Sequence, residues 1–338
     1  MRIGPAIALL AYATGFLFSN MAPARAVESA PADSTAPRTY ADSLLDWRTG
    51  REDRLRAPTG WLAVAGLFWL SDGENTFGTD ASNAIVLPEG SAPPRAGSFW
   101  FDADAAAVAA SLQPAERSPS DSAPRASFVR VRAGAGVEMR VGDSLVTDRA
   151  LLADDSGAPD ALTLGRLQFT AIKRGERFAI RMRDPESAMR REFRGIDYYA
   201  LDSEYRVEAK FTPFAGPPHR IEVPNIAGYA DSMIVPGVVS FVINGNHLQL
   251  RPVLDAPGDS SFFFIFADAT TEVETYGGGR FLYADLRPDN TLTIDFNKAY
   301  NPPCAFTPFT TCPMPPEGNR LPVPIRAGER KYESELAH

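Results

Sequence analysis

The stretch DFNKAYNPPCAFTPFTTCPMPPEGNR, residues 295–320, holds both cysteines of the chain, a dense set of prolines and several asparagines among aromatic residues. Proline fixes its own φ and biases the preceding residue towards extended geometry, so this segment loses few backbone states on folding. A long irregular loop inside a compact domain is uncommon, and is usually either functional or disordered. Phe296, Tyr300 and Phe306 are untypical of a solvated tail. We therefore expect an ordered loop that forms the wall of a site.

The N-terminus has the features of an export signal. Arg2 provides a positive charge, residues 7–18 are mostly apolar, and a small-x-small pattern ends at Ala26. The apolar run is too short to span a membrane as a helix, which takes about 20 residues. We expect residues 1–26 to be a signal peptide that is removed after Ala26, residues 27–38 to be a flexible linker, and the mature protein to be exported to the periplasm or the exterior.

The composition limits the partners and indicates the fold class. The formal net charge of −8 argues against nucleic acid or an anionic membrane as a partner, and loss of the signal peptide makes the chain more acidic. A hydrophobic fraction of 44% is sufficient for a large core. The 29 prolines and 26 glycines are scattered along the chain, which predicts many turns and many short strands.

A single amphipathic helix is predicted near the N-terminus, within residues 39–59. Tyr40, Leu44 and Trp47 fall near one face of this helix, and charged residues lie mostly elsewhere. Thr39 is a suitable N-cap, and a proline and a glycine follow the last charged residues. We expect this helix to cover one end of a β-structure.

Short segments with strand character dominate from residue 60 onwards. Several alternate between apolar and polar residues, as in 128–132, and Gly, Pro, Asp and Ser separate them. Asn244-Gly245 between apolar segments is the strongest hairpin signal. The pattern predicts a mainly β protein with an antiparallel sandwich or barrel architecture. The expected units are a β-sandwich-like half at 60–175, a second β half with the Cys/Pro-rich loop at 176–330, and a tail at 331–338.

Residues 73–173 loosely resemble a forkhead-associated domain, through ENTFGTDASNAIVLPEG at 74–90 and the hairpin VGDSLVTDR at 141–149. That family binds phosphothreonine through an arginine after its first glycine, a serine, and an asparagine in a later loop. Here Thr79 follows Gly78 in place of the arginine. The resemblance therefore implies the fold without phosphopeptide binding.

Cys304 and Cys312 are the two cysteines of the chain. An even number of cysteines at short spacing in an exported protein predicts a disulfide, which would contribute about 2–3 kcal/mol in the chain-entropy model. A zinc site would need two further soft ligands, and a nucleophilic cysteine would need a histidine, which is not nearby in sequence. With only 3 histidines in the chain, we predict no metal site, and we expect no cofactor.

Polar residues around the loop are candidates for a site. TYGGGR at 275–280 could cradle an anion, since consecutive glycines free backbone amides and Arg280 adds a fork of donors, although a β-turn or bulge explains the glycines equally well. A second set is Asp268, Asp295, Asn297, Asn301, Asn319 and Arg320. These side chains could point into a common cleft, but Asp and Asn most often cap turns.

Longer motifs resemble those of a family of unknown function, DUF1684. They are FADATTEVETYGGGRFLYADL at 266–286 and the stretch from 295 to 329, with GWLAVAGLFWLSDGENTFG at 60–78 and EYRVEAKFTPF at 204–214 fitting the same family. The resemblance spans about Tyr40 to Glu329. It supplies no activity. It implies that the following residues are typical of the family: Asp268, Tyr276, Gly279, Arg280, Asp295, Asn297, Tyr300, Asn301, Cys304, Cys312, Asn319 and Arg320.

Three hypotheses for function follow. The first is an exported all-β protein that binds a small polar or carbohydrate-like ligand in a pocket walled by the loop from Cys304 to Cys312. Its contacts would be Tyr276, Arg280, Asn297, Tyr300, Asn301, Asn319 and Arg320. The second is a hydrolase that uses Asp268 and Asp295 as acid and base. The third is a purely structural loop that locks the two halves together. Enzymatic activity and oligomeric state are left open.

Overall fold

The computed structural model describes residues 38–104, 128–254 and 258–334. The predicted signal peptide, its cleavage site and nearly all of the linker lie outside the described residues, so export stays a prediction. Within the described ranges, no helix is long and apolar enough to cross a membrane.

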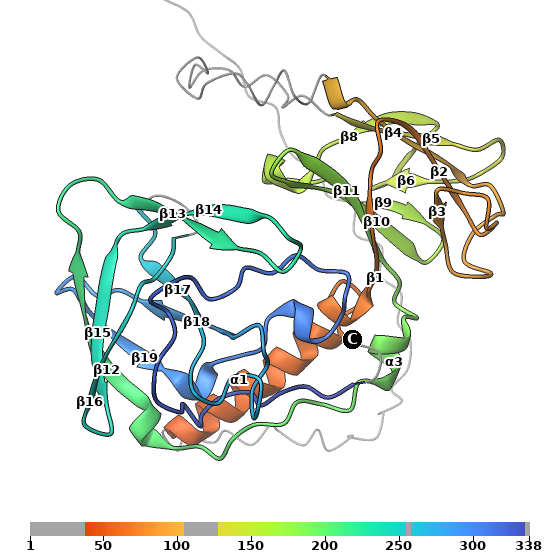
Figure 1. The fold of residues 1–338 in the computed structure, drawn as a ribbon. Coiled ribbons are helices and arrows are strands. Elements are labelled where there is room, and N and C mark those ends of the chain that lie inside the picture. Colours follow the sequence, from red (N-terminus) through yellow and green to blue (C-terminus); the bar gives the residue numbers. More distant parts are fainter. Residues whose placement is uncertain (1–37, 105–127, 255–257, 335–338) are drawn as a thin grey trace, which may run out of the picture. The chain divides into compact units, whose positions relative to one another are not determined.

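The described elements are few helices and many strands (Figure 1). The helices are α1 (Tyr40–Arg56) and α3 (Ala188–Glu192), with 3-10 turns η1 (Trp61–Ala63), η3 (Asp154–Ser156), η4 (Ser203–Tyr205), η5 (Phe296–Lys298) and η6 (Pro303–Ala305). The strands of the first half are β1 (Val64–Trp69), β2 (Gly73–Gly78), β3 (Ile85–Val86), β4 (Gly97–Phe101), β5 (Val129–Ala133), β6 (Arg140–Val141), β7 (Ser144–Leu145), β8 (Asp148–Leu151), β9 (Leu162–Leu164), β10 (Leu167–Arg174) and β11 (Arg177–Arg183). Those of the second half are β12 (Arg206–Pro213), β13 (His219–Pro224), β14 (Ala230–Val235), β15 (Gly237–Ile243), β16 (Asn246–Leu250), β17 (Ser261–Phe266), β18 (Arg280–Asp285) and β19 (Thr291–Asp295). The mainly β, largely antiparallel fold class is confirmed.

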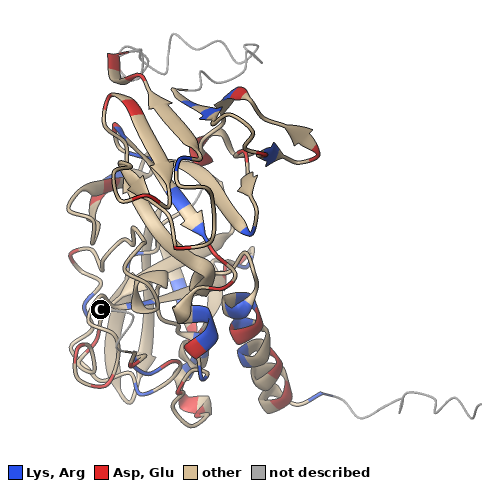
Figure 2. Cartoon of the chain, turned by 90° about the vertical axis from the view of Figure 1, so that its right-hand side faces the viewer, with Lys and Arg blue, Asp and Glu red and all other residues tan. Residues whose placement is uncertain are grey.

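Helix α1 is confirmed with its predicted start. The Thr39 hydroxyl accepts a hydrogen bond from the amide of Asp42 at 3.1 Å, and the Asp42 carboxylate accepts one from the amide of Thr39 at 3.0 Å, which forms a capping box. Leu44 and Leu55 are buried, and charged residues of both signs follow the rest of the helix (Figure 2). The helix also buries Arg51, which the sequence pattern did not predict.

The first half is a sandwich of two sheets. One sheet has the order β1-β11-β10-β9-β6-β7 and the other β3-β2-β4-β5-β8. Strand β11 pairs with β10 over its whole length and with β1 on its other side. The boundary expected at residues 175/176 would cut through this sheet, so the first half extends to Arg183. The narrower likeness to a forkhead-associated domain stays a prediction.

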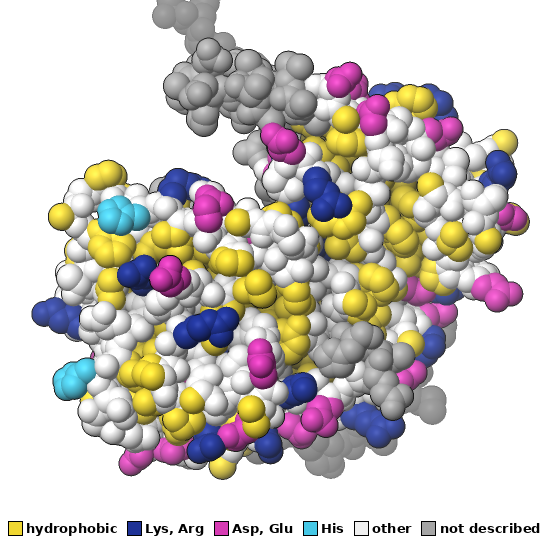
Figure 3. Space-filling view, in the orientation of Figure 1, with side chains coloured by type: hydrophobic (Ala, Val, Ile, Leu, Met, Phe, Trp, Pro, Cys, Tyr) yellow, Lys and Arg dark blue, Asp and Glu magenta, His cyan; other side chains and the backbone are white. Residues whose placement is uncertain are grey.

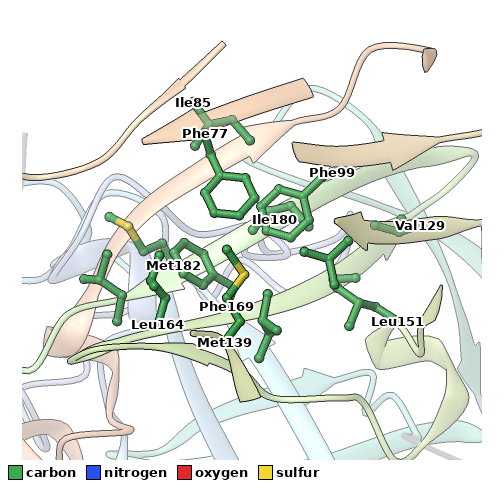
Figure 4. Close-up of a cluster of buried hydrophobic side chains, with 14 of the residues drawn as sticks. Phe77, Ile85, Phe99, Val129, Met139, Leu151, Leu164, Phe169, Ile180 and Met182 are labelled. Atoms are coloured by element: carbon green, nitrogen blue, oxygen red, sulfur yellow. The ribbon is translucent and has the colours of Figure 1, made fainter. Parts of the chain in front are cut away.

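The two sheets of the sandwich enclose an aromatic and aliphatic core (Figure 4). Phe77 of β2 and Phe99 of β4 stack with ring centroids 4.6 Å apart, and both lie 5.9 Å from the ring of Phe169 on β10. Ile180 and Met182 of β11 also point into this core. Because side chains alternate along a strand, the odd-numbered residues of β11 occupy the opposite face of the sheet.

The second half is built around the hairpin β17–β18. One face of the hairpin packs against the sheet β16-β15-β12-β19 and encloses a core that contains Phe264 and Leu282. Its other face packs on β13–β14 and on the stretch 295–320, and Phe263 and Phe281 contribute to this second core. Burial on both faces explains the unbroken apolar sequence of β17.

The stretch 295–320, here called the Pro/Cys loop, connects the two halves. The Thr307 hydroxyl donates to the carbonyl of Val64 at 3.0 Å, and Nε of Arg174 donates to the hydroxyl of Thr311 at 3.0 Å. Both Val64 and Arg174 belong to the first half. The loop is therefore a structural bridge, whatever else it does.

Candidate functional site

Arg280 lies in the interior, not in a pocket. It is 1% exposed, and Nη2 donates to Oδ2 of Asp268 and to the carbonyl of Ile325, both at 2.8 Å. Nη1 donates to the carbonyl of Ala327. Gly279 has φ +85°, and a Cβ at this position would lie 2.7 Å from the carbonyl oxygen of Phe266, which explains the glycine before the arginine. The guanidinium holds the segment after the Pro/Cys loop against β18.

The two predicted carboxylates belong to separate networks. Oδ1 of Asp268 accepts hydrogen bonds from the amide and hydroxyl of Thr270 at 2.8 and 2.6 Å, while Oδ2 binds Arg280. Oδ1 of Asp295 accepts from the hydroxyl of Tyr40 at 2.8 Å. Each carboxylate is committed to internal partners, and no described contact joins them. This placement gives no support to the acid–base pair of a hydrolase.

The predicted asparagines hold backbone segments in place. Asn297 exchanges hydrogen bonds with both backbone groups of Asp202, at 3.1 and 2.8 Å. Asn319 does the same with Arg251, at 2.8 and 2.9 Å, and its amide group also donates to the carbonyl of Ile265 at 2.9 Å. Both asparagines are fully buried. A side-chain amide can replace a missing strand partner in this way, because it carries a donor and an acceptor.

The sequence analysis did not predict a further buried polar group, the ion pair between Arg51 and Glu329. This ion pair and the internal hydrogen bonds described above are here called the buried polar network. Nε of Arg51 on α1 donates to Oε1 of Glu329 at 3.0 Å, and Oε2 of Glu329 accepts from the amide of Asn301 at 2.7 Å. The amide group of Asn301 donates to the carbonyl of Arg330 at 2.7 Å. Burial raises the pKa of Glu329 above its ordinary value, although Arg51 opposes the shift. This pair fixes the C-terminal segment to α1.

The disulfide predicted between Cys304 and Cys312 is not formed in the structure. Both thiols are free and buried, and the amide of Cys304 donates to Sγ of Cys312 at 3.2 Å. The hydrogen bond with Cys312, followed by burial, raises the pKa of the Cys304 thiol. The Tyr276 hydroxyl donates to the carbonyl of Cys304 at 3.2 Å, and burial raises the pKa of this phenol. The pair therefore acts as small apolar packing within the loop.

Aromatic and arginine side chains converge on a pocket of about 370 Å³ between α1, the hairpin β17–β18 and the start of the Pro/Cys loop. This hollow is here called the aromatic pocket. It is lined by Trp47, Arg51, Arg54, Trp61, Phe263, Phe281, Tyr283, Tyr300 and Pro303. Of the residues predicted to bind a ligand, Tyr300 lines it.

Helical spacing brings the α1 residues to the aromatic pocket. Trp47, Arg51 and Arg54 are four and three residues apart, so they lie on one face of α1. The carbon at the centre of the Arg51 guanidinium lies 4.7 Å from the centroid of the Tyr300 ring. Arg54 is exposed, and it therefore presents donors to the pocket that solvent can reach.

The β18 side of the aromatic pocket is a set of packed rings. Tyr283 pairs across the hairpin with Phe263, and their rings stack with centroids 4.7 Å apart. Phe281 packs edge-on to Phe263 at 4.9 Å and to Tyr300 at 5.9 Å. Tyr283 is 45% exposed. These contacts fix the ring positions, which preforms an apolar surface beside the arginines.

A larger hollow of about 950 Å³ lies along the sheet of β12 and β15. Arg320, the remaining predicted contact, lines it together with Lys210, Glu208 and His247. Figure 3 shows positive and negative side chains interspersed on one face of the molecule. The hollow has mixed charges and few aromatic walls, so it is a less specific candidate than the aromatic pocket.

The structure thus separates the predicted site residues. Most of them form the buried polar network, Tyr300 lines the aromatic pocket and Arg320 lines the larger hollow. Trp47, Trp61 and Tyr283 also line the aromatic pocket, and the sequence analysis did not predict them as site residues. The helical spacing of Trp47, Arg51 and Arg54 was a usable signal, because it combines an aromatic residue with two arginines on one face.

The comparisons with known proteins agree with the family resemblance. The model of the family described as "Protein of unknown function (DUF1684)" matches residues 191–330. The motif at 60–78 lies outside this match. No curated protein matches the chain.

A similar solved structure is the solution NMR structure of an uncharacterized protein of Haloarcula marismortui. It has 33% sequence identity, covers 43% of this chain and 80% of its own, and has a TM-score of 0.36. Residues 191–330, which include strands β12 to β19 and the Pro/Cys loop, belong to the DUF1684 family.

Proposed function

We propose that the protein binds a small polar, carbohydrate-like ligand in the aromatic pocket. The observation that carries this proposal is the convergence of Trp47, Trp61, Tyr283 and Tyr300 with Arg51 and Arg54 on one hollow. The walls differ from those expected from the sequence, since Tyr300 and Pro303 of the Pro/Cys loop line the pocket and the two cysteines are not among its lining residues.

The chemistry of the walls favours a ring with one apolar face and oxygen atoms at its edge. Aromatic rings offer flat apolar surfaces for the C–H face of a sugar ring, and such surfaces contribute much of the contact area in binding sites. The guanidinium of Arg54 can donate two parallel hydrogen bonds to hydroxyl or carboxylate oxygens. Arg51 is held by Glu329 and supports the Tyr300 ring.

The size of the pocket sets the expected affinity. A volume of about 370 Å³ is at the small end of ligand pockets, which run from about 300 to 1,000 Å³. A ligand of about 12 non-hydrogen atoms at about −0.3 kcal/mol per atom gains about 4 kcal/mol, which corresponds to a Kd on the order of 1 mM. The search for a ligand should therefore use methods that detect weak binding.

Saturation-transfer NMR with a panel of neutral and acidic mono- and disaccharides at millimolar concentration tests the proposal. At least one sugar should receive saturation through its ring protons, and Tyr283→Ala should abolish the signal. Trp100→Ala is the matched control, because Trp100 is 46% exposed on β4 and is not among the residues that line the pocket. A signal that both variants retain, or no signal from any sugar, would refute the proposal.

We also propose that the protein is exported, with the mature chain beginning at Val27. The support is the N-terminal pattern of charge, apolar run and small-x-small site. N-terminal sequencing of the protein from its native host should start at Val27. A chain that retains Met1 would refute export without affecting the ligand proposal.

A further inference from the structure

Arginines gather on the outer face of the β10–β11 hairpin. Arg181 and Arg183 lie on the face of β11 opposite to the core residues Ile180 and Met182. Residue 174 of β10 pairs directly with residue 177 of β11, so Arg174 lies on the same face. The face is turned towards the Pro/Cys loop, since Arg174 donates to Thr311 at 3.0 Å.

Arg181 is buried without a counter-charge among the described residues. It is 7% exposed, its Nε has no hydrogen-bond partner there, and no described carboxylate lies within salt-bridge distance. Burial first, and then the nearby charges of Arg174 and Arg183, lower the pKa of Arg181 to about 10. Nε of Arg183 is likewise buried without a partner. Arginine is rarely buried unless it is paired.

The contacts that are present only partly compensate this charge. The guanidinium of Arg181 lies 5.1 Å from the centroid of the Trp61 ring, which attracts a cation but accepts no conventional hydrogen bond. Asp154 is 2.7 Å from Arg174 and is thereby committed to it. The Tyr229 side chain lies beside Thr311, and burial raises the pKa of its phenol. The unused donors of this cluster therefore lie on β11, at Arg181 and Arg183.

Solvent reaches Arg174, which is the member of this cluster that lines a hollow. A hollow of about 530 Å³ is lined by Lys173, Arg174, Arg220 and Asp231, among others. Lys173 lies 3.7 Å from Asp155, and Asp231 accepts a hydrogen bond from Asn225 at 2.8 Å. Lys173 and Arg174 are therefore each paired with an acidic residue, and Arg220, which donates to Ser232, is the cation at this entrance that has no carboxylate partner among the described residues.

We propose that Arg174, Arg181 and Arg183 form a binding site for the oxoacid group of a small ligand, held between the outer face of β10–β11 and the Pro/Cys loop at Thr311. A phosphate, sulfate or carboxylate would supply the acceptors that the buried guanidinium groups of Arg181 and Arg183 lack. This site is separate from the aromatic pocket, although Trp61 contributes to both.

The test is thermal unfolding of the whole chain in low-millimolar sodium phosphate, sulfate or acetate, with sodium chloride keeping the ionic strength constant. At these concentrations the general stabilisation by excluded salts is small. At least one oxoanion should raise Tm by about 2–4 °C over chloride, and the three salts distinguish tetrahedral from planar anions. No rise with any of them would overturn the proposal.

Two variants test whether the oxoanion-dependent rise in Tm depends on Arg181. Arg181→Met should abolish the oxoanion-dependent rise and leave Tm in chloride equal to or above that of the wild type, because an uncompensated charge is removed. Arg177→Met is the matched control, since Arg177 stacks 3.8 Å over Trp69 on the same face but is exposed. The oxoanion-dependent rise in Tm of Arg177→Met should equal that of the wild type.

Two further outcomes decide against the proposal. An undiminished rise in Arg181→Met would overturn it. So would failure of Arg181→Met to fold, because the chain itself would then depend on the charge. Arg183→Met is a second variant of the proposed site, and it should bind the oxoanion at least tenfold more weakly than the wild type.

Discussion

Arg280 and Tyr283 lie three residues apart on β18, yet one is 1% exposed and the other 45% exposed. Arg280 points into a network of Asp268 and backbone carbonyls. Tyr283 stands at the surface of the aromatic pocket. The polar residue is buried in a structural network and the aromatic residue is partly exposed at a pocket, which is the reverse of what their chemical types suggest.

The difference follows from the cost of burying each group. An irregular loop leaves backbone groups without strand partners, and buried ones must be satisfied by side chains. Arg280, Asn297 and Asn319 donate hydrogen bonds to such backbone groups, so their polar atoms are used inside the protein. An exposed tyrosine ring is not needed to satisfy buried backbone groups. Residues that stabilise the fold and residues that bind a ligand should therefore respond differently to substitution.

The largest expected effect comes from breaking the Arg280 network. Asp268→Asn leaves the buried guanidinium without its counter-charge and should cost about 3–5 kcal/mol of unfolding free energy. Arg280→Lys should also destabilise the protein strongly, since one ammonium cannot reach the carbonyls of Ile325 and Ala327 as well as Asp268. Urea unfolding measures both.

The control for this prediction is an exposed pair on the first half. Asp148 contacts Arg130 at the surface, and Asp148→Asn should change the urea midpoint little. Equal losses of unfolding free energy in Asp268→Asn and Asp148→Asn would show that burial does not determine how much an ion pair contributes to stability.

A smaller loss is expected for Asn319→Ala. The change removes hydrogen bonds to both backbone groups of Arg251 and to the carbonyl of Ile265, in a fully buried position. Unsatisfied buried groups should lower the unfolding free energy by about 2–4 kcal/mol. Asn246→Ala, at the exposed start of β16, is the matched control and should have a much smaller effect. Comparable losses in the two variants would contradict the structural role of Asn319.

Local sequence predicts some features of this protein and not others, for a physical reason. The capped helix, the mainly antiparallel strands and the ordered Pro/Cys loop follow from periodicity, proline content and turn residues, which act locally. The pairing of Arg51 with Glu329 joins residues 278 positions apart, and no local pattern encodes it. The disulfide expectation rested on an assumed compartment, and side-chain geometry decides whether such a bond forms.

High pH should weaken the fold through buried tyrosines at the edge of the polar network. Burial, and then the hydrogen bond to Asp295, raise the pKa of Tyr40 above its ordinary value of about 10. The folded state therefore retains a proton that the unfolded chain releases first. Stability should be constant below about pH 10 and fall above it, and Tyr40→Phe should reduce the fall in urea midpoint between pH 9 and 11. An identical pH profile in Tyr40→Phe would contradict this assignment.

The smallest effect on stability is expected in the aromatic pocket. Tyr283→Ala removes a partly exposed ring, and Arg54→Met removes an exposed charge, so each should cost about 1 kcal/mol or less. Urea unfolding of the two variants beside Asp268→Asn checks the contrast directly. A loss of more than about 3 kcal/mol in Tyr283→Ala would place this ring in the core and remove the distinction.

The most direct test of the account is the affinity of one sugar identified by the NMR panel, measured by isothermal titration calorimetry on three folded variants. If the sugar binds in the aromatic pocket, Tyr283→Ala and Arg54→Met should each raise Kd at least tenfold. Arg320→Met, in the larger hollow, should leave Kd unchanged. Loss of binding in Arg320→Met with full affinity in Tyr283→Ala would contradict the account and move the site to the sheet of β12 and β15.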